Sequence, residues 1–305
     1  METNKIYQGD CLELMKQIED KSVDLILCDL PYEETGNSWD GIIDLKKLFE
    51  EYRRVLKEDG CIALTGTMKF GFKLFAVAED LYKYDWVWAK DNGTNAPNTP
   101  YQPFRIHEFV FIFGKGRVTN GTRIPMKYNP QKTKGEPYKQ TSGKISQNWK
   151  GTLRNIETDN PTGERHPLTI QYFCRDKDKV HPTQKPVELF KYIIKTYTNE
   201  GDLVLDNCIG SGTTALACVN TKRNFIGFDI NPEYCKIANE RLTKQTGGFF
   251  SSQPIGYLKN TIYMKEKIKQ KQYPEDYTKE ERELLKLIVI ERIKQTPDNF
   301  RISIG

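Results

Sequence analysis

The sequence predicts an α/β fold, in which a mostly parallel sheet carries helices on both faces. Short apolar runs alternate with amphipathic helical stretches from residue 5 to about 113, and the alternation returns between residues 186 and 244. A glycine loop, Gly210-Ser211-Gly212, joins one such run to a helix. Strands that alternate with helices pair in parallel, because each helix carries the chain back to the same end of the sheet.

Strands and helices follow one another in the first third of the chain. Val23–Cys28 is apolar apart from Asp24 and is typical of a buried strand. Between Asp44 and Lys57 the apolar side chains share one helical face, and Gly60 is expected to end that helix. The remaining segments predict helices at 11–18 and 69–81, a short apolar run at 5–8, and strands at 61–65, 85–89 and 108–113.

The same rhythm predicts the elements near the other end. Pro186 is expected to open a helix that runs to Tyr197. The segments that follow predict strands at 203–205 and 225–228 and helices ending near 220 and 244. A charged amphipathic helix is expected at 277–295, as a packing helix, a dimer contact or part of an appended module.

Composition limits the class of protein. Hydrophobic residues make up 37% and charged residues 29% of the 305, and 15 Phe, 16 Tyr and 4 Trp suffice for a core, so wholesale disorder is excluded. No stretch approaches the roughly 18 uncharged apolar residues of a membrane span. The N-terminus lacks the layout of a signal peptide. We therefore expect a soluble, cytoplasmic protein with no membrane partner.

The seven cysteines are scattered, and none forms a CxxC pair. An odd, scattered set is typical of reduced thiols that act as small core residues. The three histidines show no pairing with cysteines at ligand spacing, so no metal site is predicted.

The basic residues are concentrated in one segment. Between Lys115 and Val180, fourteen basic and six acidic side chains give a charge of +8, whereas the rest of the chain carries −3. Aromatic residues interleave with the basic ones, and the segment shows little periodicity. This pattern suits a polyanion such as the phosphate backbone of a nucleic acid. The alternative is a solvated surface insertion.

The glycine loop predicts a cofactor site. It follows the strand that ends in Asp206, and Gly210 and Gly212 let backbone amides approach a bound group at the start of a helix. Thr213 adds a hydroxyl donor, and Asp229, after the next strand, can accept hydrogen bonds from ribose hydroxyls. These residues indicate a nucleoside-containing cofactor. An ordinary tight turn and a nicotinamide oxidoreductase are the alternatives, whereas a Walker loop is excluded because no Gly-Lys-Ser/Thr follows.

A second motif, Asp29-Leu30-Pro31-Tyr32, follows the strand Val23–Cys28. The lone pair of an exocyclic amine such as adenine N6 is delocalised into the ring. A site that accepts both amino hydrogens, at the Asp29 carboxylate and a backbone carbonyl, would favour a pyramidal nitrogen. Tyr32 is a candidate to stack on the base, an interaction worth roughly 1–3 kcal/mol.

Together the two motifs resemble those of the amino-group DNA methyltransferases, which use S-adenosyl-L-methionine and carry an Asp/Asn/Ser-Pro-Pro-Tyr-type motif. The resemblance extends from about residue 5 to 242 and includes Arg105–Glu108 and His181–Leu189. The motif order is that of the beta group. This resemblance implies a circularly permuted Rossmann-like fold with a seven-stranded, mostly parallel sheet that contains one antiparallel strand, and a target-recognition region at about 114–180.

The resemblance also implies roles for individual residues. Asp29 and the Leu30 carbonyl would accept hydrogen bonds from the target amine, with Pro31 and Tyr32 completing the catalytic motif. The cofactor would lie against Asp206, Gly210, Gly212 and Thr213, with its ribose at Asp229 and its adenine amine at Asp10. Lys185 and Thr183 would lie near its methionine end.

Two positions depart from the family pattern. Leu30 stands where the family usually has proline, and Asn207-Cys208 replaces the commoner Pro-Phe. Neither change removes a reacting group, so we expect the activity to survive.

The implied activity is methyl transfer to adenine N6 in double-stranded DNA by base flipping. Aspartate at position 29 favours adenine, because cytosine-N4 enzymes more often carry serine there. The alternatives are an N4-cytosine enzyme and a catalytically silent DNA-binding homologue; the motif order and basic insertion argue against RNA or protein methylation. A homodimer and a restriction endonuclease counterpart are candidate partners.

The predicted organisation has four parts. A catalytic half spans residues 1–113, and a basic target-recognition insertion spans 114–180. A cofactor-binding half follows at 181–245, before a helical extension at 246–305.

Overall fold

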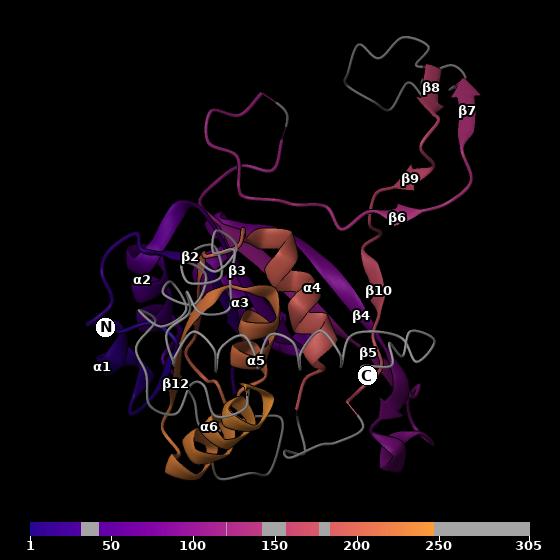
Figure 1. Ribbon diagram of the computed structural model, residues 1–305. Coiled ribbons are helices and arrows are strands. Elements are labelled where there is room, and N and C mark those ends of the chain that lie inside the picture. The colour runs from indigo at the N-terminus through magenta and orange to yellow at the C-terminus, as the bar shows by residue number, and fades with distance from the viewer. Residues whose placement is uncertain (32–42, 120, 142–156, 177–183, 247–305) are drawn as a thin grey trace, which may run out of the picture. The chain divides into compact units, whose positions relative to one another are not determined.

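A computed structural model describes residues 1–31, 43–119, 121–141, 157–176 and 184–246 (Figure 1). The chain divides into two compact units, Met1–Gly248 and Phe249–Gly305, and all of the described residues belong to the first. The helix expected at 277–295 lies outside the described residues.

The described part of the chain contains one large sheet. Its spatial order is β1 (Lys5–Gln8), β12 (Asn224–Asp229), β11 (Leu203–Asp206), β2 (Val23–Cys28), β3 (Leu56–Gly66), β5 (Arg105–Gly114), β4 (Tyr82–Thr94) and β10 (Ile170–Tyr172). Neighbours are parallel except in the two pairs that include β5, so β5 is the antiparallel strand. The predicted count of seven strands is wrong for this sheet, which has eight, because β10 of the insertion pairs with the edge of β4.

Helices cover both faces of this sheet, as predicted. In chain order they are α1 (Cys11–Met15), α2 (Leu45–Val55), α3 (Met68–Ala78), α4 (Val187–Tyr197), α5 (Thr213–Thr221) and α6 (Pro232–Thr246). Short 3₁₀ turns lie at Glu79–Leu81 and Ala96–Asn98. Helix α1 is shorter than the predicted 11–18, and α2 ends at Val55, where Leu56 already adopts an extended conformation before Gly60.

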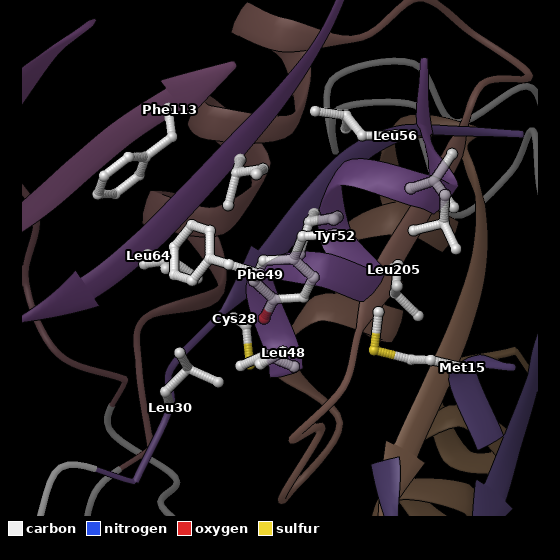
Figure 2. Packing of buried hydrophobic residues seen from close by; sticks show 14 of the residues in the cluster. Met15, Cys28, Leu30, Leu48, Phe49, Tyr52, Leu56, Leu64, Phe113 and Leu205 are labelled. Atoms are coloured by element: carbon white, nitrogen blue, oxygen red, sulfur yellow. The ribbon is translucent and has the colours of Figure 1, made fainter. Parts of the chain in front are cut away.

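Two apolar clusters fill the layers on either side of the sheet. Alternate side chains of a strand point to opposite faces. On β2, Ile26 and Cys28 therefore pack in one cluster with residues of α1, α2 and α3, whereas Leu25 and Leu27 pack in the other with residues of α4, α5 and α6. Figure 2 shows the first cluster, in which Phe49 and Tyr52 of α2 lie with ring centroids 5.3 Å apart. Burial on both faces explains why the central strands are almost entirely apolar.

The chain order reverses at the centre of the sheet, between β11 and β2. From β11 the chain passes through α5 to β12 on one side, whereas from β2 it passes through α2 to β3 on the other. Ligands of open α/β sheets bind outside the carboxyl ends of the strands at such a switch point. Asp206 ends β11 and Asp29 follows β2, so the fold places both predicted motifs at this point.

The insertion contains two short antiparallel pairs. β6 (Thr133–Lys134) pairs with β9 (Glu164–Arg165), and β7 (Tyr138–Thr141) pairs with β8 (Glu157–Asn160). The chain therefore runs out along 133–141 and returns along 157–165 as a two-stranded ribbon.

One basic residue of the insertion, Lys127, forms ion pairs with acids at the amino ends of two central strands. Lys127 Nζ lies 2.9 Å from Asp24 Oδ1 and 2.6 Å from Asp202 Oδ2, at the amino ends of β2 and β11. The charge of Lys127 is therefore balanced within the fold.

Six of the seven cysteines are buried or half-buried, and Cys174 is exposed; all seven are free thiols. Within the described residues, no helix combines the length and apolar character that a membrane span requires.

Candidate active site

The glycine loop is held against the acid that follows the next strand. Gly210 adopts a φ of +50°, and its amide donates to Asp229 Oδ2 over 2.9 Å. The other oxygen of Asp229 accepts from the amide of Asn231 at 2.8 Å. Gly212 has a φ of +82°, and a Cβ placed there would lie 2.8 Å from the Cβ of Ala238 on α6. Glycine is required at this position for both its conformation and the close approach of α6.

Asp206 is almost fully buried, at the end of β11. Its Oδ1 accepts from the amide of Cys208 at 3.0 Å, and its Oδ2 accepts from the hydroxyl of Thr214. Burial raises the pKa of Asp206 to about 7. The neighbouring Asn207 is also buried and accepts from the Tyr52 hydroxyl at 2.5 Å, so this departure from the family pattern is built into the core.

Some of the other predicted cofactor residues lie near this loop. Thr213 is buried, and its hydroxyl lies 3.5 Å from the carbonyl oxygen of Lys185. Asp10 is exposed and caps α1, where its Oδ1 accepts from the amide of Leu12 at 2.8 Å. The amide of Gly9 donates to the carbonyl of Asp229 at 2.9 Å, which brings the turn at Asp10 beside the end of β12.

Ile230, which the sequence analysis did not single out, follows Asp229 and is 68% exposed. An exposed aliphatic side chain beside a carboxylate offers an apolar surface on which a base can pack. The carboxylate can accept hydrogen bonds from the hydroxyls of the attached sugar. The donors and acceptors of this loop therefore fit a nucleoside.

Asp29 is held by two side chains from distant parts of the chain. Its Oδ1 accepts from the buried Thr65 hydroxyl on β3 at 2.5 Å, and its Oδ2 lies 2.5 Å from Lys185 Nζ. Burial raises the pKa of Asp29, and the ammonium of Lys185 offsets part of that rise.

Lys185 links this carboxylate to a second one. Its Nζ lies 3.5 Å from Oε2 of Glu108 on β5, whose Oε1 accepts from Lys90 of β4. Burial opposes the ionisation of Glu108, but the two ammonium groups lower its pKa below the ordinary value. Sequence analysis placed Lys185 near the methionine end of the cofactor, included Glu108 in the resemblance without giving it a role, and missed Lys90. The available signal was Glu108 itself, an acid that directly precedes the apolar run 109–113.

The remaining motif residues are only partly described. Leu30 is 1% exposed and belongs to the cluster of Figure 2, so the leucine that replaces the family's proline serves as a core residue. Pro31 is half-buried. Tyr32 and Thr183 lie outside the described residues.

Two further observations concern other kinds of site. Among the described residues, no group of three or more His, Cys, Asp or Glu side chains could hold a metal ion. A cavity of about 360 Å³ is lined by Tyr84, Trp86 and residues of the insertion, at the start of β4, and includes none of the predicted site residues.

Known proteins resemble this chain in sequence. A family model described as DNA methylase, of the N6/N4 type, matches residues 23–240. The type II methyltransferase M.HpaI of Haemophilus parainfluenzae is 30% identical over 266 residues, covering 81% of this chain and 76% of that protein. The DNA adenine methyltransferase YhdJ of Escherichia coli (strain K12) is 31% identical over 298 residues, covering 85% and 88%.

Two solved structures share the fold. The M1.HpyAVI–SAM complex superposes with a TM-score of 0.53 at 26% identity, over 78% of this chain and 98% of that one. The cytosine-N4-specific PvuII DNA methyltransferase gives a TM-score of 0.52 at 17% identity, over 81% and 93%. With a family match over more than half of its length, and relatives at least 30% identical over most of it, this chain belongs to the N6/N4 DNA methylase family.

Proposed function

We propose that this protein transfers the methyl group of S-adenosyl-L-methionine to the N6 amine of adenine in double-stranded DNA. One observation carries the proposal. Asp29 follows β2, and the glycine loop that begins at Asp206 follows the neighbouring strand β11. An acceptor for an amine and a turn for a nucleoside thus lie at the same switch point of the sheet.

The cofactor side of the site binds and orients. Asp229, which accepts from the amide of Gly210, would hold the ribose, and the exposed Ile230 would cover the adenine of the cofactor. The start of α5 is lined by Asp206, Gly212 and Thr213. Asp10 would accept a hydrogen bond from the adenine amine of the cofactor. When bound, S-adenosyl-L-methionine supplies an electrophilic methyl group on a sulfonium.

The substrate side activates the amine. A base inside a duplex is out of reach, so the target must be flipped out at a cost of a few kcal/mol. Asp29 and the Leu30 carbonyl accept the two amino hydrogens, which directs the nitrogen lone pair away from the ring, and Tyr32 stacks on the base. Much of the rate enhancement comes from this positioning. The excess proton leaves to solvent after the transfer.

Adenine is favoured by the aspartate at position 29 and by the similarity to YhdJ over 85% of this chain. The N4 amine of cytosine is the second candidate, because the family model covers both amines and the fold is shared with a cytosine-N4-specific enzyme. Asp29 and the glycine loop argue against a catalytically silent homologue. A homodimer and an endonuclease counterpart stay predictions.

The experiment is a methyl-transfer assay with the full chain, labelled cofactor and unmethylated genomic DNA. Asp29→Ala is expected to abolish transfer, whereas binding of S-adenosylhomocysteine stays within about twofold of the wild-type value, because Asp29 is bonded to Thr65 and Lys185, neither of which belongs to the glycine loop. Transfer at the wild-type rate by Asp29→Ala would refute this assignment of the site. Loss of cofactor binding would place Asp29 in the cofactor site instead.

A further inference from the structure

Glu108 carries an oxygen whose bonding in the described residues is incomplete. It lies on β5 directly opposite Trp88 of β4, and its Oε1 accepts from Lys90. Its Oε2 is buried and has no hydrogen-bond partner among the described residues. Leaving a buried polar group unsatisfied costs about 1–3 kcal/mol, and more for a charged one, so such an atom calls for an explanation.

The neighbouring ammonium is within easy reach of that oxygen. Lys185 Nζ lies 2.5 Å from Asp29 Oδ2 and 3.5 Å from Glu108 Oε2, and its side chain is 6% exposed. Hydrogen bonds between nitrogen and oxygen require about 2.7–3.2 Å, so a small shift of Nζ would complete the bond to Glu108. Lysine has three donors on a flexible stem, and either position keeps its charge on a carboxylate.

The present position of Lys185 competes with the substrate. Thr65 occupies Oδ1 of Asp29 and Lys185 occupies Oδ2, each at 2.5 Å. An amine that donates to Asp29 meets both of these donors. Thr65 is a neutral hydroxyl on a strand, whereas the ammonium of Lys185 has a second carboxylate beside it.

We propose that Lys185 is a movable counter-ion, which rests on Asp29 in the empty site and moves to Oε2 of Glu108 when the target amine binds to Asp29. This inference rests on the proposed methyl transfer. Lys185 and Glu108 are then positioning residues. Lys185 keeps Asp29 ionised and aligned before the base arrives. Glu108 then accepts the ammonium of Lys185, which releases one oxygen of Asp29. A fixed ion pair between Lys185 and Asp29, with the amine using a remaining lone pair, is the alternative.

Glu108→Gln tests the movement with little change of shape. The single amide oxygen of glutamine stays with Lys90, so the group facing Lys185 becomes an NH₂ that cannot accept. Glu108 then no longer offers Lys185 an acceptor, so Lys185 stays on Asp29. We expect the single-turnover rate of methyl transfer to fall at least tenfold, while the affinity for S-adenosylhomocysteine stays within twofold, both measured well below the melting temperature of the variant.

Glu58→Gln is the matched control. It removes the same charge from an acid near the start of β3, which pairs with Lys21 at 3.0 Å and with Lys115 at 3.4 Å. Its transfer rate is expected to equal that of the wild type. A general effect of lost negative charge on DNA binding would slow both variants equally.

A double-mutant cycle with Lys185→Met tests whether Glu108 acts by accepting the ammonium of Lys185 or only by supporting the surrounding structure. Without Lys185 no ammonium competes with the target amine for Oδ2 of Asp29, and Oε2 of Glu108 has no ammonium to receive from Asp29. Glu108→Gln should then cost less than twofold, against at least tenfold in the wild-type background. A loss of the same size in both backgrounds would overturn the proposal, as would a wild-type rate for Glu108→Gln alone.

The proposed function and this inference fail differently. If the wild-type chain transfers no methyl group in the same assay, the proposed function fails. If the wild type transfers and the coupling is absent, only the movable counter-ion fails. A structure of the wild type with S-adenosylhomocysteine and a target duplex provides a test that needs no variant. Lys185 Nζ is expected within 3.2 Å of Glu108 Oε2 and beyond that distance from Asp29 Oδ2; an ammonium still bonded to Asp29 would overturn the proposal.

Discussion

The backbone amide of Gly210 donates a hydrogen bond to Oδ2 of Asp229, with 2.9 Å between the two atoms. This bond fixes the glycine loop after β11 to the acid that ends β12. The loop and the acid thus form one half of the candidate site, and Asp29 with Lys185 and Glu108 forms the other.

The first prediction concerns that bond. Asp229→Ala removes both the proposed acceptor for the ribose and the acceptor of the Gly210 amide, so the affinity for S-adenosylhomocysteine is expected to fall at least tenfold, about 1.4 kcal/mol. Isothermal titration calorimetry measures the dissociation constant of S-adenosylhomocysteine. Asp80→Ala, which removes an exposed acid that pairs with Arg53, serves as the control and should bind normally. An unchanged dissociation constant for Asp229→Ala would remove Asp229 from the cofactor site.

The second prediction concerns the contact between α5 and α6. Gly212→Ala places a Cβ 2.8 Å from that of Ala238, at a φ of +82°. Gly201 has a similar φ of +87°, but a Cβ there meets nothing within 4 Å. Gly201→Ala should cost only the backbone strain, about 1–2 kcal/mol, and Gly212→Ala should cost more. Urea denaturation of both variants gives the difference, and equal losses would show that the helices yield without cost.

The third prediction concerns the buried carboxylate at the base of the sheet. Asp24 is 2% exposed and holds Lys127, Lys57 and the amide of Leu203. Because removing one partner of a buried pair is strongly destabilising, and because Lys57 remains, Lys127→Met is expected to lower the free energy of unfolding by about 2 kcal/mol at pH 7. Lys132→Met breaks the exposed pair with Glu164 and should cost less than about 0.5 kcal/mol.

The same variant has a defined pH dependence. Burial opposes ionisation of Asp24, but its hydrogen bonds lower its pKa below the ordinary value of 3.8. The stabilisation is therefore fully present above that value and is lost as the pH falls through the lowered pKa of the folded state. The difference between wild type and Lys127→Met should shrink below pH 4. A difference that stays constant down to pH 3 would contradict the ionic origin.

The fourth prediction concerns the ribbon of the insertion. Reversing the charge of both Lys132 and Lys134 is expected to weaken DNA binding at low salt and to make the plot of log affinity against log salt shallower by about 2. Lys222→Glu is the control, because Lys222 also forms an exposed ion pair, with Glu200, but lies before the amino end of β12. Fluorescence anisotropy at several salt concentrations measures the slopes. Unchanged affinity for the double variant would show that the ribbon faces away from DNA.

The sequence predicted the central sheet well, because a mostly apolar run such as Val23–Cys28 can be recognised as a buried strand from its residues alone. It did not predict β10, a three-residue strand whose Ile170 and Tyr172 are each 62% exposed, because its pairing with β4 joins segments more than 80 residues apart. Exposed apolar residues on a short edge strand carry no periodic signal.

The sequence motifs predicted which residues belong to the candidate site, but not which of them contact one another. The position of Lys185 on Asp29 joins residues 156 apart in the chain, and spacing gives no information on such a pair. Spacing also gives no information on which basic residues of the insertion have acidic partners elsewhere in the chain. Lys127 pairs with Asp24, and Arg175 pairs with Asp91.

The most direct test of the proposed function is single-molecule sequencing of DNA from cells that express the protein, reading modified bases at single-nucleotide resolution. The account predicts N6-methyladenine in a recurring short motif, absent when Asp29→Ala replaces the wild type. N4-methylcytosine in such a motif would support the assignment of the site but would show that the target base is cytosine and not adenine. Unmodified DNA, from cells in which the folded protein binds S-adenosylmethionine, would contradict the central claim.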